Sequence, residues 1–231
     1  MKKVAILQSN YIPWKGYFDI IAAVDEFILF DEMQYTVNDW RNRNRIKTPN
    51  GLQWLTVPVL TKGRYGQKIS EAEIKSSANW AKDHWKAICL NYSRAPYFKF
   101  VSERLEPYYN TADHSHVSQL NRKLIDFACE ALSITTKITD SRDYVLAEGK
   151  TERIVDLCLQ AGANEYISGP AAKSYLDEQL FEQRGIKLTW FDYNDYPEYP
   201  QLWGTFEHSV SIIDLLFNCG HDARRYLKHT R

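Results

Sequence analysis

Short, nearly continuous apolar runs alternate along the chain with longer stretches whose apolar residues recur at helical spacing. The runs at 4–7 and 26–31 have the length of strands, and the apolar stretch 18–24 between them suits a helix. Almost wholly apolar strands are typical of parallel sheets covered on both faces, and strand, helix, strand forms a right-handed βαβ unit. Helices at 151–161 and 171–183 and strands at 165–168 and 186–193 repeat this order. The pattern predicts an α/β fold with a Rossmann-like, mostly parallel sheet.

The middle of the chain has a different pattern. Pro49-Asn50-Gly51 is a turn sequence between two strand-like runs, 40–48 and 52–59, which together predict a β-hairpin. Apolar residues at helical spacing then predict helices at 80–91, 97–109 and 117–132, followed by a strand at 134–138. We therefore expect one α/β domain over 1–231, with the hairpin and helical region inserted at about 40–132.

Composition narrows the class of protein. The formal net charge is zero, which argues against a protein whose main task is non-specific nucleic-acid binding. Aromatic residues make up 14% of the chain, which suits either a stacking pocket for sugars or bases or a core built from Tyr and Trp. No apolar stretch approaches the ~18 residues that span a bilayer, and no signal peptide is recognised. We expect a cytoplasmic protein with no membrane partner.

The cysteines and histidines supply no complete set of metal ligands, because His114 and His116 could bind a metal only with ligands from elsewhere in the chain. The four cysteines are widely spaced in helix-like apolar contexts, and none has a CxxC or Cys/His metal spacing. We interpret them as reduced and mostly buried.

Polar and aromatic side chains follow the first two predicted strands. In open α/β sheets, ligands bind in the loops at the carboxyl ends of the strands. The alternative is a loop whose aromatic residues only cover the core. The candidates after the first strand are Gln8, Asn10, Tyr11, Trp14 and Tyr17, and those after the second are Asp31 and Gln34.

The predicted hairpin carries a row of cations. Alternate residues of a strand share a face, so Arg41, Arg43, Arg45 and Lys47 should lie on one face and Asn42, Asn44 and Ile46 on the other. Arginine suits phosphate because its planar guanidinium makes paired hydrogen bonds. The alternative is a solvated edge strand that charge protects from aggregation.

A late turn could hold an anion. Ser168-Gly169 ends a predicted strand, and the helix expected from 171 would direct its N-terminal N–H groups at this edge of the sheet. Lys173 adds a cation in the first turn, where the helix dipole disfavours one. No stretch matches a P-loop, so any ATP would be held in another way.

Several blocks of this chain, spread over nearly its whole length, resemble the WbqC-like family. They are Gln8-Ser9-Asn10-Tyr11-Ile12-Pro13-Trp14-Lys15-Gly16-Tyr17-Phe18-Asp19, Asp31-Glu32-Met33-Gln34-Tyr35, Trp40-Arg41-Asn42-Arg43-Asn44, Trp54-Leu55-Thr56-Val57-Pro58, Tyr166-Ile167-Ser168-Gly169 with Tyr175-Leu176, Tyr199-Pro200-Gln201, and Ser211-Ile212-Ile213-Asp214-Leu215-Leu216-Phe217-Asn218. Two departures stand out: Ser9 replaces a usual proline, and Pro170-Ala171-Ala172 replaces a glycine pair.

The resemblance implies a role in surface-polysaccharide biosynthesis, as in O-antigen and lipopolysaccharide. It also implies a transferase or amide-forming enzyme that acts on a nucleotide-linked sugar. One such reaction attaches an amino acid such as glycine to the amine of a dTDP-4-amino-4,6-dideoxy sugar. The partners would then be the nucleotide sugar and an aminoacyl donor, either aminoacyl-tRNA or another carrier.

The first loop is also similar, more weakly, to the nucleotidylyltransferase signature His-x-Gly-His. Aligning Lys15-Gly16-Tyr17 with its last three positions puts Trp14 and Tyr17 where that group has histidines. The resemblance implies a shared fold, but the histidines of the adenylylation chemistry are absent.

Amide formation needs a base, donors to the developing oxyanion, and positioning. The catalytic candidates are Asp31 as base, or else a structural carboxylate, together with Asn10 and Tyr11. The substrate-binding candidates are Gln8, Trp14, Tyr17, Gln34, Arg41, Asn42, Arg43, Asn44, Ser168, Gly169, Lys173, Tyr175, Tyr199 and Gln201. Two other hypotheses are a module that recognises tRNA or another carrier through the hairpin, and an ATP-dependent nucleotidyl- or ligase-type enzyme. The residues specify neither a cofactor nor an oligomeric state.

Overall fold

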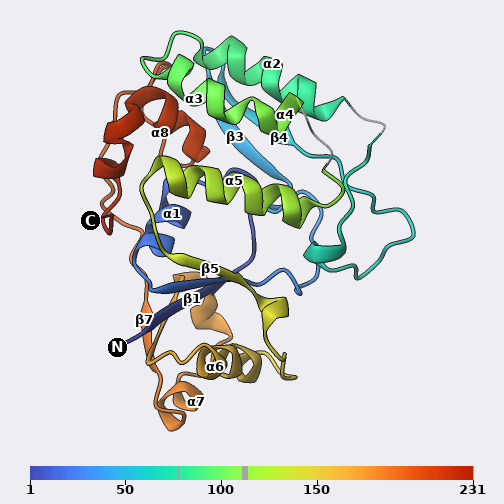
Figure 1. The fold of residues 1–231 in the computed structure, drawn as a ribbon, viewed down its shortest axis with the longest axis vertical. Helices are drawn as coiled ribbons and strands as arrows, with labels where there is room; N and C mark the ends of the chain where they lie inside the picture. Colours follow the sequence, from blue (N-terminus) through green and yellow to red (C-terminus); the bar gives the residue numbers. More distant parts are fainter. Residues whose placement is uncertain (77–78, 111–113, 231) are drawn as a thin grey trace.

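A five-stranded parallel sheet forms the centre of the structure, a computed structural model that describes residues 1–76, 79–110 and 114–230. The strands are β1 (Lys3–Leu7), β2 (Glu26–Leu29), β5 (Lys137–Asp140), β6 (Glu165–Ser168) and β7 (Lys187–Trp190). Their order across the sheet is β5-β2-β1-β6-β7, and every neighbouring pair is parallel. This confirms the predicted Rossmann-like α/β fold (Figure 1).

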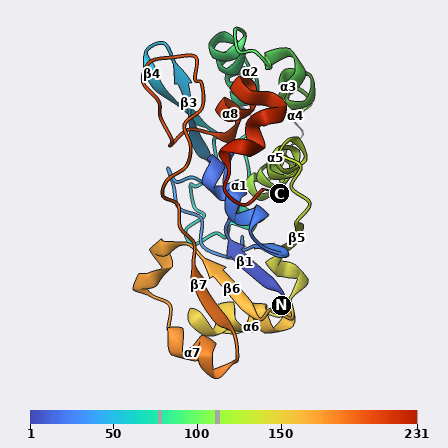
Figure 2. The ribbon, with the colours of Figure 1, turned by 90° about the vertical axis from the view of Figure 1, so that its left-hand side faces the viewer.

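Successive side chains of each strand point to opposite faces of the sheet, and this divides the core into two layers. Ala5, Phe27 and Leu29 belong to the cluster that includes helices α1 (Lys15–Ala22), α5 (Val117–Ala131) and α8 (Ile212–Cys219). Val4 and Ile28 point to the opposite cluster, which includes α6 (Thr151–Gln160) and α7 (Glu178–Gln183). The sheet is therefore buried on both faces, as Figures 1 and 2 show, and this explains why its first two strands are apolar almost throughout.

The strand order creates a topological switch point between β1 and β6. From β1 the chain proceeds to β2 and then β5 on one side, and β6 and β7 are added on the other side. In open α/β sheets, ligands bind at such a point, which here lies at the carboxyl ends of β1 and β6. Gln8 follows β1 there, and Gly169 follows β6.

The predicted hairpin is present and extends the molecule away from the sheet (Figure 2). Strands β3 (Arg43–Thr48) and β4 (Gly51–Thr56) pair in antiparallel fashion around a turn in which Gly51 has φ +101°. Helices α2 (Trp80–Tyr92), α3 (Phe98–Leu105) and α4 (Pro107–Asn110) lie beside it. β3 begins at Arg43 rather than at residue 40, so Arg41 precedes the strand. The alternation of side chains along β3 therefore does not determine the direction of the Arg41 side chain.

The prediction of one continuous helix over 171–183 is wrong. A 3₁₀ helix, η3 (Pro170–Ser174), follows β6, and α7 begins only at Glu178. Asp177 lies between them in extended conformation and caps α7 by accepting a hydrogen bond from the Gln179 N–H. The long helix whose N-terminus was to face an anion at Ser168-Gly169 therefore does not form. The other 3₁₀ helices are η1 (Ile69–Glu71), η2 (Ser141–Asp143) and η4 (Gly220–Tyr226).

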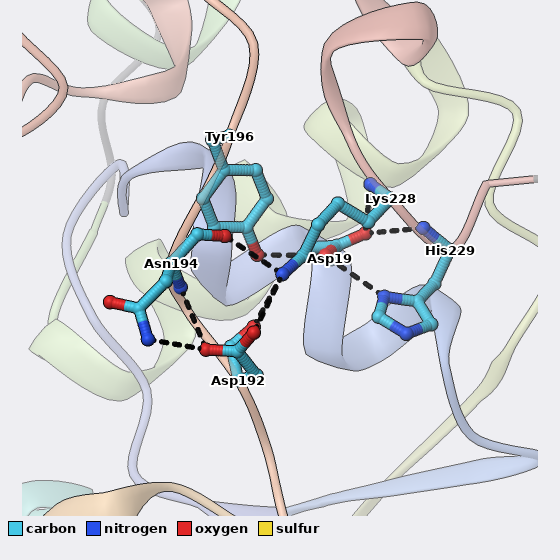
Figure 3. Close-up of polar contacts among 6 residues, drawn as sticks. All are labelled: Asp19, Asp192, Asn194, Tyr196, Lys228 and His229. Carbon is cyan, nitrogen blue, oxygen red and sulfur yellow. Dashed lines mark hydrogen bonds and ion pairs between the residues drawn. The ribbon is translucent and has the colours of Figure 1, made fainter.

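A buried carboxylate joins the C-terminal segment to the first helix (Figure 3). Asp19, fully buried on α1, accepts hydrogen bonds from the backbone N–H groups of Lys228 at 2.8 Å and His229 at 2.7 Å. It also accepts one from the Tyr196 hydroxyl at 2.7 Å. Lys228 Nζ in turn donates to the carbonyl oxygens of Asp192 and Asn194. These bonds hold the segment 192–196 against α1, next to the switch point.

Over the described ranges, no helix combines the length and the apolar character that crossing a bilayer requires.

Candidate functional site

An arginine is fixed at the carboxyl end of β1. Arg41 Nη1 donates a hydrogen bond to Asn10 Oδ1, and its Nη2 donates to Gln8 Oε1. The two amides follow β1, whereas Arg41 comes from the segment before β3, so the contact joins the sheet to the hairpin. The Arg41 side chain retains 17% of its exposure. The result is an oriented guanidinium at the switch point, where an anionic group of a ligand could bind.

A buried carboxylate is hydrogen-bonded to the loop that carries Gln8 and Asn10. Asp31, 2% exposed, accepts a hydrogen bond from the Ser9 N–H at 2.7 Å. Asn121 donates to the Ser9 hydroxyl at 3.0 Å and completes the support. Burial raises the pKa of Asp31 above its usual value, and Asp140 acts in the same direction, while Ser9 and Arg41 oppose the rise. A raised pKa suits a group that accepts a proton near neutral pH.

The loop after β1 is held in a strained conformation. Ile12 has φ +36°, which is a genuine outlier for a β-branched residue. Asn44 Nδ2 donates to the carbonyl oxygens of Tyr11 at 3.1 Å and Ile12 at 2.9 Å, and the Tyr11 N–H donates to Trp40 O at 2.9 Å. Backbone strain of this kind persists where the surroundings enforce it, often at ligand sites. The hairpin thus imposes the shape of the loop.

A cavity of about 210 Å³ opens between this loop and the hairpin. Its lining consists of two tryptophans, two asparagines and two smaller residues: Asn10, Pro13, Trp14, Trp40, Asn44 and Ser209. Asn10 lines the cavity and also binds Arg41, so the cavity adjoins the cluster of Arg41, Gln8 and Asn10. Cavity and cluster together are the candidate site.

The Trp14 wall of the cavity is built from three separate segments. The Trp14 ring packs against Tyr193 at 5.5 Å and Tyr196 at 5.7 Å between ring centroids. A Cβ built on Gly16 would lie only 2.3 Å from Trp14 Cζ2, so the ring occupies the space above that glycine. Tyr193 also reaches the β6 side, since a Cβ on Gly169 would lie 3.6 Å from its ring. Trp14 is thereby oriented before any ligand binds.

Several predicted site residues support the loop from inside. The Tyr11 side chain is fully buried, and its hydroxyl is hydrogen-bonded with His84 and with Tyr109, each at 2.8 Å. Tyr17 is 3% exposed and donates from its hydroxyl to Gln8 O at 3.0 Å. Burial raises the pKa of both tyrosines.

The two asparagines of the hairpin also have structural partners. Asn42 donates to Val57 O at 2.8 Å, and Asn44 holds the strained loop. Ser168, 3% exposed, ends β6 at the switch point, where Gly169 packs under Tyr193.

Other predicted residues lie outside this group. Gln34 is exposed and forms an isolated β-bridge with Lys68. On η3, Lys173 lies over the Trp190 ring at 5.5 Å, and Tyr175, which directly follows η3, is 57% exposed.

Tyr199 and Gln201 belong to a separate buried network. Both donate to Asp214 Oδ1, at 2.9 Å and 3.0 Å. Lys47 joins this network by donating to Gln201 Oε1 at 2.6 Å, and it is only 5% exposed. The expectation that Lys47 shares an open cationic face with the arginines is therefore wrong.

The outer face of the hairpin combines arginine with tryptophan. The Arg43 guanidinium lies 4.2 Å from the Trp54 ring centroid, and that of Arg45 lies 5.5 Å from it. Trp54 and Trp40 are each 42% exposed, with ring centroids 5.5 Å apart. The predicted alternation holds for Asn44 and Ile46, which are buried on the opposite face.

Four residues of the site were missed from the sequence, and one of them, Pro13, lies within the predicted loop after the first strand. Trp40 stands directly before Arg41, and its place in a polar run was an available signal. Tyr193 was visible only as one of many tyrosines in a loop. Ser209 had no signal, because its position on the cavity depends on the path of the 192–210 segment. Among the residues that the structure describes, no group of three or more His, Cys, Asp or Glu side chains could hold a metal ion.

Comparison with known proteins identifies a matching protein family. The sequence profile of the WbqC-like protein family matches residues 8–226. The chain is 57% identical over 231 residues to an uncharacterized protein of Mycobacterium tuberculosis, Rv1507c, and the alignment covers the whole length of both chains. No solved structure matches.

Proposed function

The chain belongs to the WbqC-like protein family, and we propose that it is a cytoplasmic enzyme of surface-polysaccharide biosynthesis that acylates a nucleotide-linked amino sugar. The acceptor class is a dTDP-4-amino-4,6-dideoxy sugar, and the group transferred is an aminoacyl group such as glycyl. The observation on which the proposal rests is Arg41, held by Gln8 and Asn10 at the switch point of the sheet. An oriented guanidinium at this position is suited to a diphosphate.

In the proposed reaction, the sugar amine nitrogen forms a bond with the carbonyl carbon of an acyl ester. The bond between that carbon and the ester oxygen breaks. The proton released by the amine passes through Asp31 to the departing oxygen, which leaves as a hydroxyl. Asp31 suits this role because burial raises its pKa. The amide N–H group of Gln8, whose oxygen is bonded to Arg41, is the donor to the developing oxyanion.

Tyr11 has no direct part in this scheme, because its hydroxyl is buried between His84 and Tyr109. Its side chain instead positions the loop that carries Asn10.

Calorimetry with dTDP and a dTDP-4-amino-4,6-dideoxy sugar tests the proposal. Arg41→Ala should weaken binding of both at least about tenfold, since hydrogen bonds to charged groups contribute about 1.5–3 kcal/mol. The matched control is Arg225→Ala, because that side chain is 76% exposed and pairs only with Asp222 among the residues described. Unchanged affinity in Arg41→Ala at low salt would contradict the proposal. So would stabilisation by ATP with Mg²⁺ and none by dTDP, which would favour a ligase-type enzyme.

The hairpin face favours a second candidate function, recognition of an aminoacyl-tRNA or another nucleic-acid carrier. Guanidinium groups beside exposed tryptophans, as at Arg43 and Trp54, resemble the stacking surfaces that bind single-stranded nucleic acid. Fluorescence anisotropy with labelled tRNA over a range of salt concentrations tests it. Salt-dependent binding that Arg43→Ala weakens would support a carrier site. Absence of binding at low salt would remove this candidate.

A further inference from the structure

We propose that the cavity between Trp14 and Trp40 is a pocket for the base thymine or uracil. The inference rests on the proposed function in one respect, which is that the substrate carries a nucleotide. The candidate site then divides into two parts. The cavity takes the base, and Arg41 takes the diphosphate outside it.

The walls of the cavity have the chemistry of a stacking site. Two indole rings and Pro13 supply flat apolar surfaces, and every base has a π-face that can pack on them. Trp14 is held by Gly16, Tyr193 and Tyr196, so it needs little ordering on binding. Trp40 also lines the cavity and is 42% exposed.

Two polar groups that line the cavity are available to bind the edge of a base that carries carbonyl groups. Asn44 is fully used, because its Nδ2 bonds to the loop carbonyls and its Oδ1 accepts from the Arg45 N–H at 2.8 Å. Asn10 Oδ1 is taken by Arg41, whereas Asn10 Nδ2 makes no hydrogen bond with any residue described. The same is true of the Ser209 hydroxyl within the described part of the chain.

These two groups complement the edge of a thymine or uracil ring. The amide N–H of Asn10 is a donor to a ring carbonyl, such as O4. The Ser209 hydroxyl is an acceptor for the N3–H group.

The cavity is large enough for a one-ring base. A cavity of about 150 Å³ holds benzene, so the 210 Å³ found here accommodates one six-membered ring with its exocyclic groups. The match of Asn10 and Ser209 to the carbonyl and N3–H groups, rather than the volume, distinguishes this base from adenine. The ribose and diphosphate must then lie outside, on the Asn10 side, where Arg41 is located.

Calorimetry with dTDP, UDP and ADP on the full chain tests the pocket. The wild-type protein should bind dTDP and UDP at least about tenfold more tightly than ADP. Trp40→Ala should lose about tenfold or more in dTDP affinity, while Trp40→Phe retains most of it. Leu52→Ala is the matched control, because Leu52 lies on the same hairpin, is 38% exposed and does not line the cavity.

Three results would overturn the base pocket alone: equal affinity for ADP and dTDP, unchanged dTDP affinity in Trp40→Ala, or an equal loss in Leu52→Ala. In each of these cases, Arg41-dependent binding of dTDP would leave the proposed function standing. If the wild-type protein binds none of the three nucleotides, the proposed function fails together with the pocket.

Discussion

The Trp14 ring lies directly over Gly16, so an alanine at this glycine perturbs the cavity from behind. The added Cβ would be 2.3 Å from Trp14 Cζ2 and 2.5 Å from Cη2. Carbon atoms pack at about 3.5–4.0 Å, so the ring must move by more than ~1 Å. It would then lose its contacts with Tyr193 and Tyr196, each worth about 0.5–1.5 kcal/mol beyond burial. Gly16→Ala should therefore lower the free energy of unfolding by about 1–3 kcal/mol.

A double-mutant cycle with Trp14→Ala isolates this cause. Without the indole ring the Cβ has no overlap, and alanine in place of glycine within helix α1 should stabilise the fold by up to about 1 kcal/mol. The effect of Gly16→Ala should thus change sign between the two backgrounds. Urea unfolding followed by far-UV circular dichroism measures all four proteins without depending on tryptophan fluorescence. Gly16→Ala should also weaken dTDP binding, because Trp14 lines the cavity.

Equal destabilisation by Gly16→Ala in both backgrounds would refute this reasoning. The glycine would then be required by the backbone of α1 rather than by the indole ring above it.

The remaining predictions concern buried carboxylates. Although burial opposes it, hydrogen bonds from Lys2, Tyr144 and other neighbours lower the pKa of Glu26 from 4.5 to about 2. The ionised carboxylate thus contributes about 3 kcal/mol of stability above pH 4.5 that is lost as the pH falls toward 2. Glu26→Gln should remove most of this dependence in urea unfolding at several pH values, and an unchanged acid profile would contradict it. Burial raises the pKa of Asp31, so folding disfavours the ionised form of this carboxyl group relative to the protonated form. Asp31→Asn should therefore abolish turnover without lowering stability at pH 7, and normal turnover with lower stability would make Asp31 structural. Asp19→Ala leaves the N–H groups of residues 228 and 229 without their acceptor, which should cost at least about 2 kcal/mol. Hydrogen exchange should accelerate at these two amides, and unchanged protection would contradict the role of Asp19.

Much of the sheet could be predicted because its strands are locally distinctive. Each of the apolar runs that precede Gln8 and Asp31 predicts a strand, and the turn Pro49-Asn50-Gly51 predicts the hairpin. The carboxyl ends of parallel strands meet at one edge, so Gln8, Asn10 and Asp31 could be expected near one another before any contact was known.

The rest of the site depends on long-range packing that periodicity does not encode. The bond between Arg41 and Gln8 spans 33 positions and forms only because β3 begins after Arg41. Lys47 follows the alternation of its strand but is buried, because the segment carrying Gln201 folds over it. The helix predicted from 171 failed since Asp177, a strong N-cap residue, starts a new helix inside the apolar pattern.

The most direct test of the central claim is a crystal structure of the protein soaked with a dTDP-4-amino-4,6-dideoxy sugar. The account predicts the diphosphate within hydrogen-bond distance of Arg41, the thymine between Trp14 and Trp40, and the sugar amine directed toward Asp31. Electron density for the nucleotide at another part of the sheet edge, or on the outer hairpin face beside Trp54, would contradict it.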